Sequence, residues 1–174
     1  MTRVNLQSLT RDKSFYINSM NEYQYRATKI LEKINELASI SEDEDCITRR
    51  FGTGKFMEGA NKVLQWMKEA RLQARIDNMG NVRGKLFCNE EAAKTLVIAS
   101  HIDTVINAGK FDGPLGVIMG LDLIEHLIQA KTKLPFHIEV IAFCDEEGAR
   151  FHTTYLGSTT VAGSFDKNLL EKKD

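Results

Sequence analysis

The chain has 174 residues, of which 43% are hydrophobic and 27% charged, with a formal net charge of −1. This length predicts one domain or part of a larger one, and the composition is typical of a soluble globular protein. No basic field favours nucleic acid, and no apolar run is long enough to span a bilayer, so we expect neither partner. Three widely spaced cysteines and a polar N-terminus predict a cytoplasmic location.

The first half of the chain predicts two helices followed by a hairpin. Residues 1–20 show no clear periodicity and are predicted to form an N-terminal tail, ahead of a domain at 21–174. Apolar residues recur at helical spacing in two stretches, and two β-rich stretches flank a turn. The predicted elements are helices at 23–40 and 55–71 and strands at 72–76 and 82–87.

The second half predicts a strand, a helix and a second strand. Short runs of β-branched residues at 96–99 and 136–143 are typical of buried strands. The stretch 115–130 between them is apolar on more than one face, which predicts a well-buried helix. The order of elements predicts an α/β fold, with a mixed three-layer sheet flanked by helices.

Chemically active side chains follow both of these strands. His101 and Asp103 stand at the exit of the first strand, and Glu146 and Glu147 at the exit of the second. Asp112 lies in the loop between the two strands. Ligands of open α/β sheets bind at the carboxyl ends of the strands. An imidazole and several carboxylates at that edge suit zinc and similar divalent ions.

The spacing suggests a chemical role for each of these groups. Residues two apart on an extended strand share a face, so Asp103 could accept a hydrogen bond from the ring nitrogen of His101 that binds no metal. Asp112 could bridge two metal ions, which lie ~3.5–4 Å apart in two-metal hydrolases. One carboxylate of the pair Glu146 and Glu147 could bind metal, while the other accepts a proton.

Each pattern also has a purely structural explanation. A lone His-x-Asp is often a surface pair, Asp-Gly-Pro is an ordinary turn signal, and Glu-Glu-Gly could be a solvated strand exit. Arg150 could bind a substrate carboxylate or pair with a neighbouring acid. His152 fits a substrate contact and a plain loop residue equally well. His126 is predicted to lie on a helix surface, and His137 to face solvent.

Three motifs together resemble the M20-type metallo-amidohydrolases. They are Ser-His-Ile-Asp-Thr-Val at 100–105, Gly-Lys-Phe-Asp-Gly-Pro-Leu-Gly-Val at 109–117, and Asp-Glu-Glu-Gly-Ala-Arg-Phe at 145–151, continued by Tyr-Leu-Gly-Ser at 155–158. The most similar branch contains N-carbamoyl-L-amino acid hydrolases, allantoate amidohydrolases and β-ureidopropionases. Stretches at 47–50, 66–67 and 77–82 also resemble that branch, so the likeness covers about 22–165.

The resemblance implies a zinc-peptidase-like fold and a role for each matching residue. His101 would bind one metal, Asp112 would bridge the two, and Glu147 would bind the other. Glu146 would be the general base, and Asp103 would orient His101. The cofactors would be two divalent ions, with zinc, manganese, cobalt and nickel as the options.

The implied reaction is hydrolysis of a linear, non-peptide C–N bond in a small ureido or carbamoyl substrate, by a homodimeric enzyme. The Arg-Phe at 150–151 favours this branch over the peptidase branches. One alternative is an aminopeptidase or deacylase of the same superfamily. Another is a non-catalytic remnant that acts as a binding module.

The resemblance also implies missing parts. Family members are more than twice as long, and they carry two further metal-binding histidines and a lid that forms the dimer. We therefore expect the chain to be the N-terminal part of the catalytic domain, incomplete at its C-terminal side. We also expect it to bind metal weakly, to catalyse little or no hydrolysis alone and to self-associate.

Overall fold

The computed structural model describes residues 21–174, and the predicted tail at 1–20 lies outside them. Each predicted helix and strand is present, with ends shifted by a few residues, and a short 3₁₀ helix, η2, follows them. In chain order the elements are α2 (Glu22–Ala38), α3 (Gly54–Glu69), β1 (Gln73–Ile76), β2 (Val82–Leu86), β3 (Thr95–His101), α4 (Pro114–Gln129), β4 (His137–Phe143), α5 (Leu156–Val161) and η2 (Lys167–Glu171).

The helix starts have local causes. The side chain of Asn21 accepts a hydrogen bond from the backbone of Gln24, whose side chain accepts one from the Asn21 backbone, so α2 begins with a capping box. The hydroxyl of Thr53 caps α3 by accepting from the N–H of Phe56. Pro114 occupies the first turn of α4, where its missing N–H has no consequence.

The four strands form one mixed sheet in the order β1-β2-β4-β3. β1 pairs with β2, and β2 with β4, in antiparallel directions. β3 and β4 are parallel, with Thr95 opposite His137 and His101 opposite Phe143. Because α4 connects these parallel strands, their carboxyl ends meet at one edge of the sheet. This arrangement confirms the predicted α/β fold with a mixed sheet. The prediction that the strand at 96–99 is buried is wrong, because β3 is an edge strand in which Leu96 and Val97 are about half exposed.

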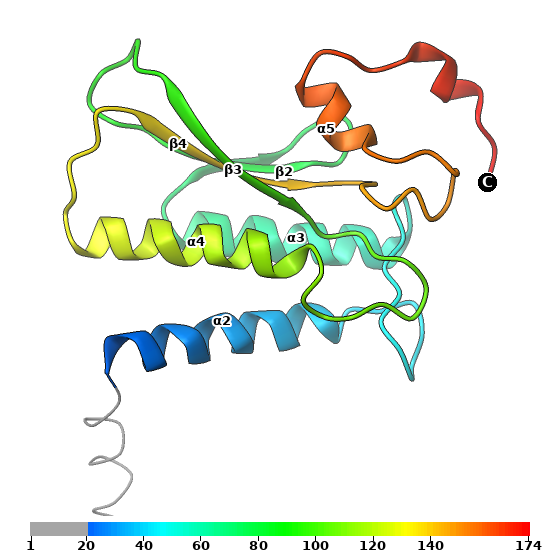
Figure 1. Cartoon of the computed structure of the whole chain (residues 1–174), viewed down its shortest axis with the longest axis horizontal. Coiled ribbons are helices and arrows are strands. Elements are labelled where there is room, and N and C mark those ends of the chain that lie inside the picture. The colour runs from blue at the N-terminus through cyan, green and yellow to red at the C-terminus, as the bar shows by residue number, and fades with distance from the viewer. Residues whose placement is uncertain (1–20) are drawn as a thin grey trace, which may run out of the picture.

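The helices lie on both sides of the sheet (Figure 1). α3 packs against β1 and β2, and α4 packs against β3 and β4, on one face. α2 packs on α4 as a further layer, and α5 lies on the opposite side of the sheet. The hydrophobic core fills the space between the sheet and α3 and α4. No helix among residues 21–174 is long and apolar enough to cross a membrane.

The fourth helix is buried on two sides and exposed on a third. Val117, Leu121 and Ile124 are buried against the core, whereas Met119 and Leu123 on the outward side are exposed. α4 covers β3, which is an edge strand, so no described element lies beyond the outward side of the helix. The sheet and α2 thus bury α4 on two sides, as expected, and only the side with Met119 and Leu123 is exposed.

Candidate metal centre

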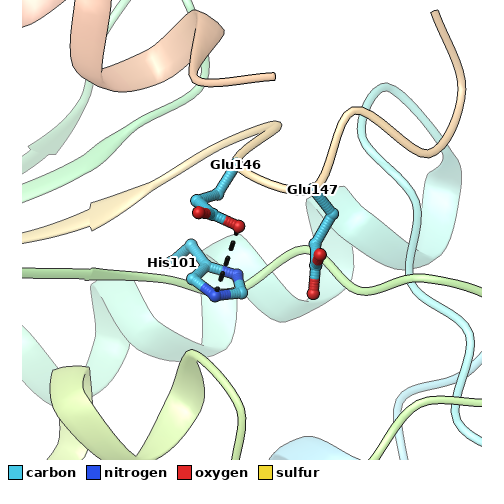
Figure 2. A group of neighbouring side chains, drawn as sticks. All are labelled: His101, Glu146 and Glu147. Atoms are coloured by element: carbon cyan, nitrogen blue, oxygen red, sulfur yellow. Dashed lines mark ion pairs between the residues drawn. The ribbon is translucent and has the colours of Figure 1, made fainter. Parts of the chain in front are cut away.

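The exits of β3 and β4 bring three side chains together (Figure 2). His101 is the last residue of β3, and Glu146 and Glu147 lie in the turn after β4. One ligand atom from each of the three lies within 4.8 Å of the others. His101 Nε2 is 3.7 Å from Glu146 Oε2. The prediction that these residues meet at the carboxyl edge is confirmed, because parallel pairing places both exits there.

The ring of His101 is held from two sides. Its Nδ1 lies 3.1 Å from the backbone carbonyl oxygen of Asp103. Because a carbonyl can only accept, Nδ1 carries the proton and Nε2 keeps a free lone pair. Behind the ring, a Cβ on Gly113 would lie 2.6 Å from His101 Cε1, so only glycine fits there. The ring therefore presents Nε2 to the carboxylates.

Asp103 is bonded differently from the prediction. Its carboxylate lies 3.7 Å from His101 Nδ1, which is beyond a hydrogen bond. Instead, Oδ1 accepts the backbone N–H of Glu146 and Oδ2 that of Glu147, each at 3.1 Å. β3 ends at His101, so Asp103 no longer follows the alternation of an extended strand. Its backbone orients the imidazole, and its carboxylate positions the acidic pair.

Asp112 lies at the rim of the centre. It precedes α4, its side chain is 79% exposed, and its Oδ1 lies 3.9 Å from His101 Nε2. The compact group of three therefore contains Glu146, which we expected as the base, and leaves Asp112 outside. Asp112 faces the same ring nitrogen as Glu146 does, so it remains within reach of an ion bound there.

The electrostatics of the centre favour a cation. Burial raises the pKa of Asp103, although the two N–H groups that it accepts oppose the rise. Burial also raises the pKa of Glu147, and the charges of Glu146 and Asp112 raise it further, against the influence of His101. Several carboxylates surround one imidazole, and a divalent ion would relieve their repulsion. The donor set of one nitrogen and several oxygens fits such an ion.

Sequence reasoning missed Asp145, which lies beside the acidic pair. Its backbone has a φ of 49°, in the left-handed region that residues other than glycine rarely adopt. Its carboxylate is buried, and Oδ2 has no hydrogen-bond partner among the described residues. Burial, reinforced by the charge of Asp103, raises the pKa of Asp145 to about 7. Only the run of three consecutive acids in the sequence pointed to it.

Arg150 and His152 lie outside the group of three. Nε and Nη2 of Arg150 both lie 2.8 Å from Asp174 Oδ2, and Nη1 donates to the carbonyl of Phe51 at 3.2 Å. The partner of Arg150 is thus an acid 24 residues away in sequence. His152 is exposed, and its carbonyl accepts from Lys172 Nζ. Their predicted contacts with substrate remain predictions.

The remaining described histidines have structural partners. His126 Nδ1 lies 3.0 Å from Glu22 Oε1 on the surface of α4, which agrees with the expected helix-surface position. The expectation that His137 faces solvent is wrong, because it begins the central strand β4 and is only 2% exposed. Its Nδ1 accepts the backbone N–H of Cys88 at 3.0 Å, and its Nε2 lies 3.4 Å from the carbonyl of Glu91.

Comparison with known proteins agrees with this site. The sequence profile described as Peptidase family M20/M25/M40 matches residues 97–173. Allantoate deiminase 1 from Glycine max is 39% identical over 82% of this chain and 30% of its own length. The N-carbamoyl-L-amino-acid amidohydrolase of Pseudomonas sp. (strain NS671) is 35% identical over 81% of this chain and 34% of its own length.

A solved structure shows the same fold. The hydantoinase/carbamoylase family amidase from Burkholderia ambifaria superposes with a TM-score of 0.78 at 27% identity, over 84% of this chain and 36% of that one. The chain thus spans about a third of the length of the relatives that it matches. The matches in sequence and in fold agree with the strand-exit motifs, and the chain is similar to members of the peptidase family M20/M25/M40 over about a third of their length.

Proposed function

We propose that this chain forms part of the catalytic centre of a metal-dependent amidohydrolase that cleaves a linear C–N bond of an N-carbamoyl amino acid or of allantoate. The observation that carries the proposal is the group of His101, Glu146 and Glu147, whose ligand atoms lie within 4.8 Å of one another at the strand exits. The substrate class is supported by the names of the relatives, which act on allantoate and on N-carbamoyl-L-amino acids.

In this proposal, His101, Asp112 and Glu147 hold two divalent ions, with zinc, manganese, cobalt or nickel as the options. The free lone pair of His101 Nε2 and the exposed carboxylate of Asp112 support their assignment as ligands. When bound, the metal supplies positive charge that polarises a carbonyl and makes water more acidic. Three protein ligands shared by two ions predict weak binding by the chain alone.

Glu146 is proposed as the general base. Its Oε2 lies 3.7 Å from His101 Nε2 and its side chain is partly exposed, so its carboxylate can face a water molecule beside the metal ligands. Glu146 would accept a proton from the attacking water and deliver it to the leaving nitrogen. Asp103 holds the backbone N–H of Glu146 and thereby keeps the base in position.

Arg150 is proposed to bind the carboxylate of the substrate. Its Nε and Nη2 already hold a carboxylate oxygen of Asp174, which shows that the side chain presents two donors to an anion. His152 is exposed in the same loop and is proposed as a further contact. A substrate carboxylate would have to displace Asp174 from Arg150.

The cellular location and the oligomeric state of the whole protein are also proposals. The described cysteines are all free thiols, which supports a reducing, cytoplasmic location. A homodimer is proposed for a protein of the relatives' length, because the resemblance implies a lid that forms the dimer. Because the chain spans about a third of the relatives' length, the isolated chain is expected to catalyse little or no hydrolysis.

A chimera tests the proposed function. The matched segment of allantoate deiminase 1 from Glycine max, 144 residues long, is replaced by the corresponding residues of this chain. Hydrolysis is measured on allantoate, an N-carbamoyl-L-amino acid, ureidopropionate and a dipeptide, with each of the four metals. We expect turnover of one of the first three, and Glu146→Gln should abolish it.

The control for the chimera is Glu69→Gln, which changes an exposed carboxylate at the end of α3. It should leave turnover unchanged. Turnover of the dipeptide alone would favour the aminopeptidase or deacylase alternative. A folded, metal-loaded chimera that hydrolyses none of the four compounds would contradict the proposed function and favour a binding module.

A further inference from the structure

Arg49 is a buried cation without a carboxylate partner among residues 21–174. Its side chain is 1% exposed, and its guanidinium contacts backbone carbonyls only. Nε donates to Ile102 at 2.8 Å, while Nη1 donates to Leu37 at 2.8 Å and Ile40 at 2.9 Å. Burial lowers the pKa of Arg49 to about 10. Burying a charge costs the free energy of its hydration, so the position of Arg49 needs a structural or functional explanation.

The contacts of Arg49 join two distant parts of the chain. Leu37 lies in the last turn of α2 and Ile40 just beyond its C-cap, where the carbonyls at the helix end carry partial negative charge that offsets the guanidinium. Ile102 and Thr104 belong to the segment after β3. The backbone N–H of Arg49 donates to Thr104 Oγ1 at 2.8 Å, and the N–H of Thr104 donates to the Arg49 carbonyl at 3.1 Å. Arg49 therefore holds both neighbours of Asp103.

Asp103 carries this restraint into the metal centre. Its carbonyl fixes the ring of His101, and its carboxylate accepts the N–H groups of Glu146 and Glu147. All three residues of the compact group therefore depend on the position of one residue, Asp103. Asp103 lies between two residues that Arg49 binds, Ile102 and Thr104.

The helix beside Arg49 makes room for it. Gly59 lies inside α3, where glycine is less favourable than alanine. A Cβ at this position would lie 2.8 Å from Cδ and 3.3 Å from Nε of Arg49. The glycine therefore accommodates the arginine side chain.

We propose that Arg49 is a positioning residue of the metal centre, which acts through Asp103 to set the ring orientation and tautomer of His101 and the placement of Glu146 and Glu147. This inference rests on the metal site of the proposed function. It assigns a role to a residue that touches none of the proposed metal ligands. Its link to the centre runs through Ile102 and Thr104, the two neighbours of Asp103.

The test compares Arg49→Lys and Arg49→Met with the unchanged 174-residue chain. Zn²⁺ affinity is measured by titration calorimetry, and the tautomer of His101 by ¹⁵N NMR of the metal-free protein at alkaline pH. The single ammonium of lysine cannot reach Ile102 and the α2 carbonyls together, so both variants should behave alike. We expect an affinity about 10–100-fold lower and a mixture of tautomers in place of the Nδ1–H form.

A matched control separates positioning from general destabilisation. Val63→Ala removes core volume from the same helix as Gly59, at a fully buried site outside the hydrogen bonds of Arg49. It should lower the unfolding temperature while leaving the tautomer and the Zn²⁺ affinity unchanged. Gly59→Ala keeps the arginine but displaces it, and should shift both readouts in the same direction as the Arg49 variants do.

Three outcomes would overturn the proposal. The first is a folded Arg49→Met variant with the original tautomer and affinity. The second is full recovery by Arg49→Lys, because charge alone would then suffice. The third is an equal loss in Val63→Ala. If the Arg49 variants do not fold, an unshifted Gly59→Ala overturns it. If the unchanged chain binds no Zn²⁺, the proposed metal site fails, and the tautomer alone still decides the role of Arg49.

Discussion

The two ends of the β3–β4 strand pair each hold a buried histidine, and the two differ in what their ring nitrogens contact. His101 ends β3 at the carboxyl edge, is 8% exposed, and has only Nδ1 hydrogen-bonded, to a backbone carbonyl. His137 begins β4 at the opposite end, where the N–H of Cys88 contacts Nδ1 and the carbonyl of Glu91 lies near Nε2. Burial alone therefore does not distinguish a potential ligand from a structural residue.

The surroundings of each ring explain the difference. Both parallel strands end at the carboxyl edge, and the turn after β4 places the carboxylates of Glu146 and Glu147 close to His101. At the amino edge the ring is enclosed by the backbone that follows β2 and leads into β3, and it stacks edge-on against Phe87. Backbone groups satisfy both nitrogens of His137, which leaves no lone pair for a ligand. A free lone pair beside acidic groups is thus the informative observation.

The largest expected effect concerns metal binding. His101→Ala removes the only imidazole of the centre and should lower Zn²⁺ affinity by at least about 100-fold, the upper range for loss of a supporting residue. His137→Ala should leave the affinity unchanged. Equilibrium dialysis with elemental analysis measures both variants. Equal losses in the two variants would mean that the ends of the strand pair do not differ in function.

The next effect is on stability, where we expect His137→Ala to cause a larger loss than His101→Ala. His137→Ala leaves the N–H of Cys88 without its acceptor and opens a gap in a buried strand. We expect the free energy of unfolding in urea to fall by about 2 kcal/mol. His101→Ala should lower it less, because the ring lies at the open edge. A smaller loss for His137→Ala than for His101→Ala would contradict the structural role.

A third, smaller effect comes from the glycine behind His101. Gly113 has a φ of +80°, and a Cβ there would displace the ring. Gly163 has a φ of +72° with no atom within 4 Å of such a Cβ, so Gly163→Ala imposes similar backbone strain without the clash. We expect Zn²⁺ affinity to fall by about 10-fold in Gly113→Ala and to stay constant in Gly163→Ala. Calorimetry that finds equal affinities would show that the ring tolerates displacement.

The last effect is a pH dependence, the smallest per pH unit, and it concerns Asp145, whose buried carboxylate has an oxygen without a hydrogen-bond partner among the described residues. Its pKa is raised to about 7 in the folded chain, so the folded state binds this proton more tightly than the unfolded state does. In metal-free protein, stability should therefore fall as pH rises from about 4 to about 7, by at most about 1.4 kcal/mol per pH unit. Asp145→Asn should remove that slope. Urea denaturation across this range measures it, and an unchanged slope would contradict the assignment.

Much of the fold could be predicted because its causes are local. Helical periodicity predicted α2 and α3, and the turn at 78–81 predicted the hairpin. The meeting of His101 with Glu146 followed from a single inference, that ligands of open α/β sheets bind at the carboxyl ends of the strands. The exposed side of α4 did not follow from the pattern, because periodicity reports apolar residues and not whether a neighbouring element covers them.

The sequence by itself determined the elements, their order and the set of acidic and imidazole groups at the strand exits. The tertiary structure decided which atoms those groups bond. It turned the carboxylate of Asp103 away from the imidazole, enclosed His137, paired Arg150 with Asp174 and placed Arg49 between α2 and the site. These contacts join residues far apart in the chain, and their partners depend on how elements pack, which no local pattern of side chains specifies.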